Sequence, residues 1–190
     1  LNTVSICHWD PINDYIVQNH ADYKLNVSSD LEVSNEAISY ISSNDPDCMF
    51  LHFDDVDHAG HSDGFSPTVS QYITAIEGVD ALLTPIMQSI SQRPNYANED
   101  WLVLITSDHG GVGTSHGGTS IEHQNVAVIA SGNTITQNII RKDSSLIFDS
   151  VYNCLADTTE LQFDGVNDYV QIPSNLAYNF GTNQDFTIEC

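Results

Sequence analysis

Short apolar runs alternate with segments of helical period along the first 156 residues of the chain. The apolar runs have the length of β-strands and cover residues 3–7, 48–53, 101–106 and 125–130. Apolar residues recur every three or four positions, the period of an amphipathic helix, over residues 34–41, 66–90 and 144–155. Strands that alternate with helices predict an α/β sandwich with a mostly parallel central sheet.

Two of these segments carry more detailed expectations. The run at residues 101–106 is almost continuously apolar, which is typical of a strand buried on both faces of a parallel sheet. Ser66 and Pro67 have the residue types of a helix cap and first helical position, so we expect the long helix to begin there. Pro85 lies inside that helix and is expected to kink it.

The pattern changes after Asp157. Apolar and polar residues then alternate with period two over residues 161–173, with turn residues between them, and no helix-period segment follows. We therefore expect a domain boundary here, with one domain over residues 1–157 and the start of a β-sandwich over residues 158–190. The second segment is too short to bury a core of its own.

The charge balance is strongly acidic, with 26 acidic residues against 4 basic ones and a formal net charge of −22. Such a surface repels nucleic acids and other polyanions, which argues against a partner such as a nucleic-acid duplex. A phosphate-containing substrate would need local metal charge to be held. Solubility in a salty medium, where repulsion is screened, explains the same composition without reference to function.

The cysteines show no metal-binding or redox spacing, and no apolar run approaches the roughly 18 residues of a membrane span. Cys7 and Cys48 lie in strand-like runs, which favours buried and unreactive thiols, whereas Cys154 and Cys190 lie further along the chain. The chain starts at Leu1 without a methionine, so we expect the natural N-terminus to lie upstream. The lack of a signal peptide is then uninformative.

Aspartate and histidine gather in three short clusters next to glycine. The clusters are Asp57 to His61, Ser107 to Gly110, and Thr114 to Gly117. Aspartate oxygen and histidine nitrogen are the ligands that zinc takes in hydrolytic sites. The first two clusters follow predicted strands, and open α/β sheets bind ligands at the carboxyl ends of their strands. Five of these residues are candidate ligands: Asp57, His61, Asp108, His109 and His116. Five ligands indicate two ions, and a pair about 4 Å apart can clamp the oxygens of a phosphoryl transfer.

Each cluster also has a structural explanation. In the first cluster, an aspartate and a histidine four residues apart arise often by chance. In the second, Asp108 could close a turn through its side chain. In the third, His116 alone could be an ordinary loop histidine. Asp54 and Asp55 are expected to cap or position their loop. His58 and His123 are expected to lie beside the site or at the surface, and no role is assigned to His8, His20 and His52.

The three clusters in this order resemble the alkaline phosphatase superfamily, and within it the type I phosphodiesterase/nucleotide pyrophosphatase group. The resemblance covers roughly residues 1–156 and is carried by residues 50–61, 72–80, 106–111 and 113–118. It implies an alkaline phosphatase-like fold. It also implies one zinc ion bound by Asp57, His61 and His116, and a second bound by Asp108 and His109.

The same resemblance requires a Thr or Ser nucleophile at a helix N-terminus and a further aspartate on the first strand. Neither has a match here, because Asp10 lies in a different context. We therefore expect no catalytic nucleophile in this chain, a position for it upstream of Leu1, and no turnover by the chain alone.

The tail resembles the opening strands of laminin-G/concanavalin A-like jelly rolls, through residues 161–170 and 185–189. This resemblance implies an extracellular setting and a possible glycan partner.

Together these expectations describe a secreted or periplasmic zinc-dependent enzyme that hydrolyses phosphoric esters, with a small phosphate ester or nucleotide-like substrate and a covalent phospho-enzyme in the intact protein. A sulfatase of the same superfamily is the nearest alternative, although the nitrogen-rich ligand set favours phosphate chemistry. A non-catalytic extracellular adhesion protein is the second alternative.

Overall fold

The computed structural model describes residues 1–132 and residue 135. The described residues divide into two compact units, one formed by residues 1–101 with 109–126, the other containing residues 102–108 and 127–132. The helix expected over residues 144–155, the expected domain at 158–190, Cys154 and Cys190 lie outside the described residues.

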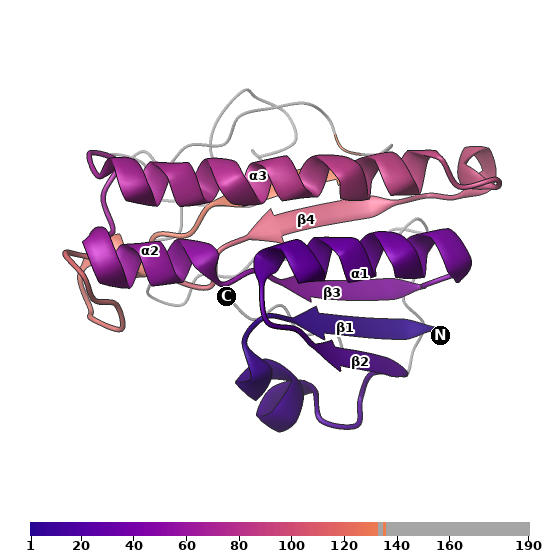
Figure 1. Cartoon of the computed structure of the whole chain (residues 1–190), viewed down its shortest axis with the longest axis horizontal. Helices are drawn as coiled ribbons and strands as arrows, with labels where there is room; N and C mark the ends of the chain where they lie inside the picture. Colours follow the sequence, from indigo (N-terminus) through magenta and orange to yellow (C-terminus); the bar gives the residue numbers. More distant parts are fainter. Residues whose placement is uncertain (133–134, 136–190) are drawn as a thin grey trace, which may run out of the picture. The chain divides into compact units, whose positions relative to one another are not determined.

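A parallel sheet forms the centre of the first unit (Figure 1). Its strands lie in the order β2 (Tyr23–Asn26), β1 (Thr3–Cys7) and β3 (Cys48–His52). In the central strand, Cys7 is opposite Asn26 on one side and His52 on the other. The carboxyl ends of all three strands therefore lie at the same edge. The strands predicted at residues 3–7 and 48–53 and the α/β fold with a parallel sheet are confirmed, whereas β2 was not predicted.

Helices pack on this sheet and on each other. Helix α1 (Asp30–Ser43) contacts β1 and β3, α3 (Ser70–Ser91) packs on α1, and α2 (Asp55–Asp63) packs on α3. Shorter segments are η1 (Ile12–Val17), η2 (Tyr96–Asn98) and α4 (Ile121–Gln124). Among the described residues, the buried apolar side chains come from β1, α1 and α3 and are Val4, Ile6, Cys7, Val33, Ala37, Ile41, Ile86 and Ile90.

Helix α1 begins at Asp30, four residues before the helical segment predicted over residues 34–41. The Ser29 hydroxyl accepts a hydrogen bond from the Glu32 amide, and the Glu32 carboxylate accepts one from the Ser28 amide. The first of these bonds satisfies a backbone donor that the first turn of a helix leaves free, and the second holds the residue before the cap. Residues 30–33, which precede the predicted segment, therefore belong to the helix.

The long helix α3 begins at Ser70, so the expected start at Ser66 and Pro67 is wrong. The Ser66 hydroxyl accepts from the Thr68 amide, and the Ser66 carbonyl accepts from the Val69 amide. These bonds close a turn that precedes the helix, so the cap-like residues serve the turn instead. The helix continues past Pro85 to Ser91.

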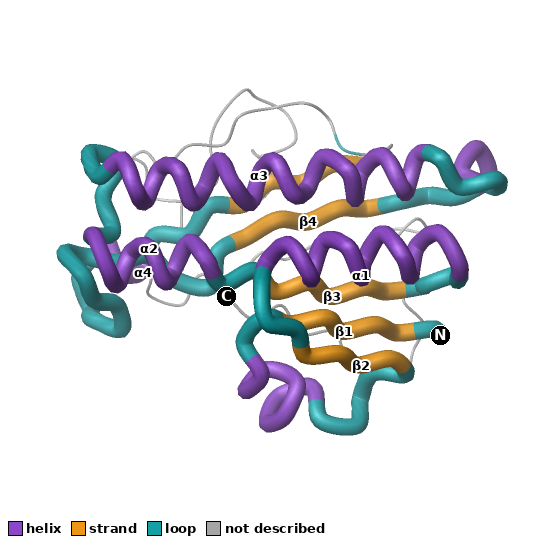
Figure 2. Tube along the Cα trace, in the orientation of Figure 1, coloured by secondary structure: helices purple, strands orange, loops and turns teal. Residues whose placement is uncertain are grey.

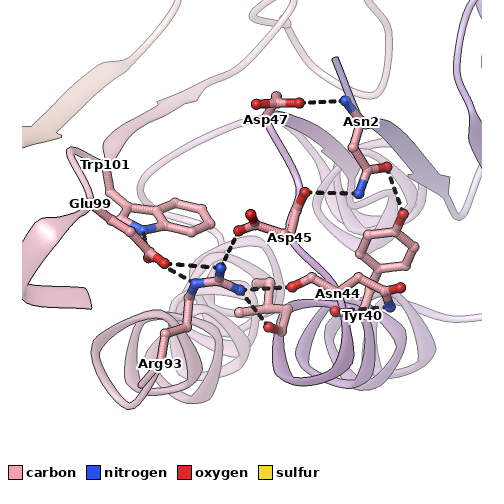
Figure 3. Close-up of polar contacts among 9 residues, drawn as sticks. Asn2, Tyr40, Asn44, Asp45, Asp47, Arg93, Glu99 and Trp101 are labelled. Carbon is pink, nitrogen blue, oxygen red and sulfur yellow. Dashed lines mark hydrogen bonds and ion pairs between the residues drawn. The ribbon is translucent and has the colours of Figure 1, made fainter. Parts of the chain in front are cut away.

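Arg93, just after α3, ties several segments of the first unit together (Figure 3). Its guanidinium donates to the Glu99 carboxylate at 2.8 and 3.0 Å, to the carbonyls of Ile41 and Asn44, and to the Asp45 carboxylate. It also lies 5.5 Å from the Trp101 ring centroid. A planar group with five donors can make such a set of bonds, which lysine cannot.

The described part of the second unit contains β4 (Leu102–Thr106) and β5 (Val128–Gly132), which pair antiparallel. The expectation that residues 101–106 form a strand buried on both faces of a parallel sheet is therefore wrong, because Leu102 and Leu104 are exposed. A short apolar run does not reveal the direction of its neighbour.

Cys7 is buried, and burial raises the pKa of its thiol, as expected for an unreactive cysteine. Cys48 is exposed, so its expected burial is wrong: it opens β3, where the strand has only begun to enter the sheet. Among the described residues, none of the helices has the length and apolar character needed to span a bilayer.

Candidate metal centre

Helix α2 follows the carboxyl end of β3 almost directly and carries the first predicted pair of ligands (Figure 2). Asp57 and His61 are four residues apart on this helix and lie on the same face, with His61 Nε2 3.4 Å from Asp57 Oδ2. Because the segment is helical, the four-residue spacing brings the side chains of Asp57 and His61 next to each other.

The segment between β4 and α4 brings two further histidines to the other oxygen of Asp57. His109 Nε2 lies 3.9 Å from Asp57 Oδ1, and His116 Nε2 lies 3.7 Å from the same atom. The two imidazole rings stack with their centroids 3.8 Å apart. We call Asp57, His61, His109 and His116 the Asp57 cluster; the ligand atoms of Asp57, His109 and His116 all lie within 4.8 Å of one another.

Backbone carbonyls fix the orientation of two of these rings. His61 Nδ1 donates to the Thr114 carbonyl at 2.9 Å, and His109 Nδ1 donates to the Gly110 carbonyl at 3.0 Å. A carbonyl can only accept, so in a neutral ring Nε2 carries the lone pair. Histidines that bind metals are commonly held in this way by an outer hydrogen bond. The ring orientation therefore suits a cation beside Asp57.

The surroundings of the Asp57 carboxylate also suit a cation. Its Oδ1 atom is buried and accepts no hydrogen bond from the described residues, although it faces two imidazole nitrogens. A buried carboxylate oxygen without a donor is costly unless a cation compensates it. The oxygen and nitrogen donors present are those that zinc takes in catalytic sites. The cluster thus fits a divalent metal ion.

Aromatic side chains border the cluster. Phe65 lies edge-on to His61 and His116, and Tyr72 of α3 lies next to Phe65. Burial, and secondarily the negative charge of Asp57, raises the pKa of the Tyr72 hydroxyl above its usual value. Tyr72 is therefore neutral at physiological pH.

The remaining predicted residues lie elsewhere or have other partners. Asp108 belongs to the second unit, so it is placed only within that unit, and the expected second ion at Asp108 and His109 stays a prediction. His58 is exposed and pairs with Asp54 at 3.1 Å. His20 is exposed, whereas His123 lies on α4 with a buried Nδ1 atom that has no hydrogen-bond partner among the described residues.

Sequence reasoning missed the residue that holds the start of α2. The buried Asp30 carboxylate accepts hydrogen bonds from the amides of Asp54 and Asp55 at 2.7 and 3.1 Å, and from His8 Nδ1 at 2.8 Å. Asp54 was expected to cap or position its loop; its side chain makes no capping bond. The available signal was an aspartate at a helix start beside the carboxyl edge of the sheet.

His8, Asp30 and Asp55 form a second group whose ligand atoms lie within 4.8 Å of one another. Both Asp30 oxygens already accept hydrogen bonds from the protein, unlike Asp57 Oδ1. Burial, and then the charge of Asp30, raises the pKa of the Asp55 carboxyl. We therefore infer that this group stabilises the start of α2 and does not bind a ligand.

The sequence matches a known protein family. Residues 10–148 match the Metalloenzyme superfamily, so the chain belongs to that superfamily. Membership implies a metal cofactor and agrees with the alkaline phosphatase-like α/β fold. It does not identify the metal.

Curated relatives give a more limited likeness. The chain is 32% identical over 89 residues to a 2,3-bisphosphoglycerate-independent phosphoglycerate mutase of Haloquadratum walsbyi, covering 47% of this chain and 16% of that protein. It is 34% identical over 79 residues to the protein of the same name from Haloarcula marismortui, covering 42% and 13%. The aligned stretch is thus a small part of each relative. Neither match supports the phosphodiesterase branch or a laminin-G-like module.

Proposed function

We propose that this chain forms a zinc-binding part of an enzyme that transfers phosphoryl groups from small phosphate esters, with water as the acceptor. The observation that carries the proposal is the Asp57 cluster, where a buried carboxylate oxygen faces two imidazole nitrogens and accepts no hydrogen bond from the described residues. The superfamily membership and the names of the two relatives support the same class of chemistry.

Zinc is the proposed metal because the cluster is rich in nitrogen. Three imidazoles and one carboxylate suit zinc better than magnesium or calcium, which prefer oxygen ligands. The same donor set distinguishes this site from the oxygen-rich calcium site expected of a sulfatase. We propose that Asp108 contributes to a second ion together with His109, as the family resemblance implies.

Each protein group has a defined task in this scheme. A bound ion would neutralise charge on the phosphoryl oxygens and lower the pKa of water. Asp57 balances the positive charge of the ion, and the carbonyls of Thr114 and Gly110 keep two imidazoles in the metal-binding orientation. Neutral Tyr72 places no further negative charge beside an anionic substrate.

A second candidate function is the transfer of a phosphoryl group between two positions of one organic molecule. The names of both relatives favour it, since a mutase performs such a transfer. The two functions share the Asp57 cluster and differ in the acceptor. Release of free phosphate distinguishes hydrolysis from an internal transfer.

The test is calorimetric titration of inorganic phosphate into the 190-residue chain, with and without zinc or manganese. We expect phosphate to bind only when metal is present, and His61→Ala and His116→Ala to abolish that binding. His20→Ala, a change at an exposed histidine outside the cluster, serves as the matched control and should bind as the wild-type chain does. Phosphate binding that is independent of metal would contradict the proposal, and preferential sulfate binding would favour the sulfatase alternative.

Turnover is tested separately with nitrophenyl phosphate, bis-nitrophenyl phosphate and nitrophenyl sulfate. Since no residue here matches the nucleophile of the family, we expect the chain alone to be inactive and a natural form that carries the nucleophile to release phosphate. Loss of a member of such a catalytic group costs several orders of magnitude in rate. Clear phosphatase activity of the chain alone would show that the nucleophile is among its residues.

A further inference from the structure

Phe65 occupies a position between the two segments that supply the Asp57 cluster. It follows α2, which carries Asp57 and His61, and its amide donates to the Gly113 carbonyl at 2.7 Å. Gly113 belongs to the segment that carries His109 and His116. Phe65 is therefore bonded to the second source of ligands while it is joined through the chain to the first.

The Phe65 ring contacts ligands from both sources. Its centroid lies 5.4 Å from the His61 ring at an interplanar angle of 80°, and 6.0 Å from the His116 ring at 89°. These are edge-to-face contacts, which fix the relative orientation of rings better than a loose apolar contact does. On its remaining side, Phe65 meets Tyr72 at 5.7 Å.

Two glycines, one inside the first sequence cluster and one directly after the second, make room for this ring. A β-carbon at Gly60, on α2, would overlap the Phe65 ring, and so would a β-carbon at Gly111. Gly60 is buried inside a helix, where alanine would ordinarily be more stable by about 1 kcal/mol. The glycine is explained by the ring that lies against it.

We propose that Phe65 is a positioning residue for metal binding: its ring, held between Gly60 and Gly111, sets His61 and His116 at the geometry that one ion requires. This inference rests on the proposed function, because it concerns the same cluster. Phe65 acts only through the two imidazoles and through the fixed separation of α2 from the segment at 109–117. It also keeps water away from one side of the cluster.

The experiment measures metal affinity by competition with a coloured chelator in the 190-residue chain and its variants. Because outer residues that orient ligands typically contribute ten- to a hundredfold to metal affinity, we expect a loss of about that size for Phe65→Leu and Phe65→Ala. Gly60→Ala should weaken binding too, since its methyl group displaces the ring. The visible spectrum of the cobalt-loaded chain should change in the same variants, because it reports ligand geometry.

The decisive comparison is the double variant Gly60→Ala/Phe65→Ala. If the added methyl group acts through the ring, it should hardly change the metal affinity once the ring is removed. The double variant should then bind metal no more weakly than Phe65→Ala. Tyr23→Leu is the matched control: it removes a ring that pairs with Tyr40 at 4.9 Å in the same unit. It should lower thermal stability without changing metal affinity or the cobalt spectrum.

The outcomes separate this inference from the proposed function. Failure of the wild-type chain to bind metal would overturn both. If the wild-type chain binds metal but Phe65→Leu and Gly60→Ala leave the metal affinity and the cobalt spectrum unchanged, only the role of Phe65 is overturned. The same holds if Gly60→Ala lowers the metal affinity equally in the presence and absence of the Phe65 ring. Circular dichroism establishes that each variant is folded, and Phe65→Leu decides the question if Phe65→Ala does not fold.

Discussion

At the scale of single residues, Arg93 makes the stability of the first unit depend on pH. Hydrogen bonds from Arg93, and then from Trp101, hold the pKa of the Glu99 carboxyl below its usual range. An acid whose pKa is lower in the folded state stabilises the fold above its unfolded pKa, and this contribution disappears as the pH falls through the folded pKa.

Glu99→Gln should therefore reduce the loss of stability on acidification. We expect the thermal midpoint of the wild-type chain to fall more than that of the variant between about pH 6 and pH 3. Differential scanning calorimetry across this range measures both. Equal falls in the two proteins would show that the Arg93 bonds contribute nothing to acid sensitivity.

The residues of the Asp57 cluster could be picked out from the sequence because their types and spacings are chemically specific. Asp57 and His61 have helical spacing, and His109 follows a strand end. Phe65 could not be picked out, because a phenylalanine in a loop has no signature of its own. Asp30 has the residue type of a helix start, but its role was missed because the amides that it accepts from lie 24 and 25 residues away in the sequence.

At the scale of elements, helix α2 depends on α1. The start of α2 has no capping side chain of its own, and the Asp30 carboxylate of α1 accepts from its first amides instead. A carboxylate at the positive end of a helix is favourable, particularly when it is buried. The helix that carries Asp57 and His61 is therefore held by a bond from its neighbour.

Asp30→Ala should destabilise the chain by about 1–3 kcal/mol, because it leaves partly buried backbone donors without acceptors. It should also weaken metal binding through the displacement of α2. Asp80→Ala, at an exposed aspartate of α3, is the control and should have little effect on either property. Chemical denaturation and metal titration provide the measurements. A fully stable Asp30→Ala with wild-type metal affinity would refute this role.

Element types could be predicted from hydrophobic period, but boundaries and strand directions could not. The parallel pairing of β1 and β3 agrees with the expected α/β fold. The start of α3 was misplaced because Ser66 closes a turn with hydrogen bonds that mimic a cap. The direction of β4 depends on β5, a long-range contact that the apolar run at 101–106 does not encode.

At the scale of the whole molecule, the net charge of −22 opposes the compact state through repulsion among carboxylates. Salt screens this repulsion, with a Debye length that falls from about 10 Å at 0.1 M to about 3 Å at 1 M. We expect the thermal midpoint to rise as sodium chloride increases over this range. A midpoint that falls with added salt would mean that attractive ion pairs outweigh the repulsion.

The central claim is that the Asp57 cluster binds a divalent metal ion. Its most direct test is the metal content of the 190-residue chain after equilibrium dialysis against trace zinc or manganese. The account predicts at least one tightly held ion in the wild-type chain and in His20→Ala, and its loss in His61→Ala and His116→Ala. Unchanged metal content in both of these cluster variants, or no bound metal in the wild-type chain, would contradict it.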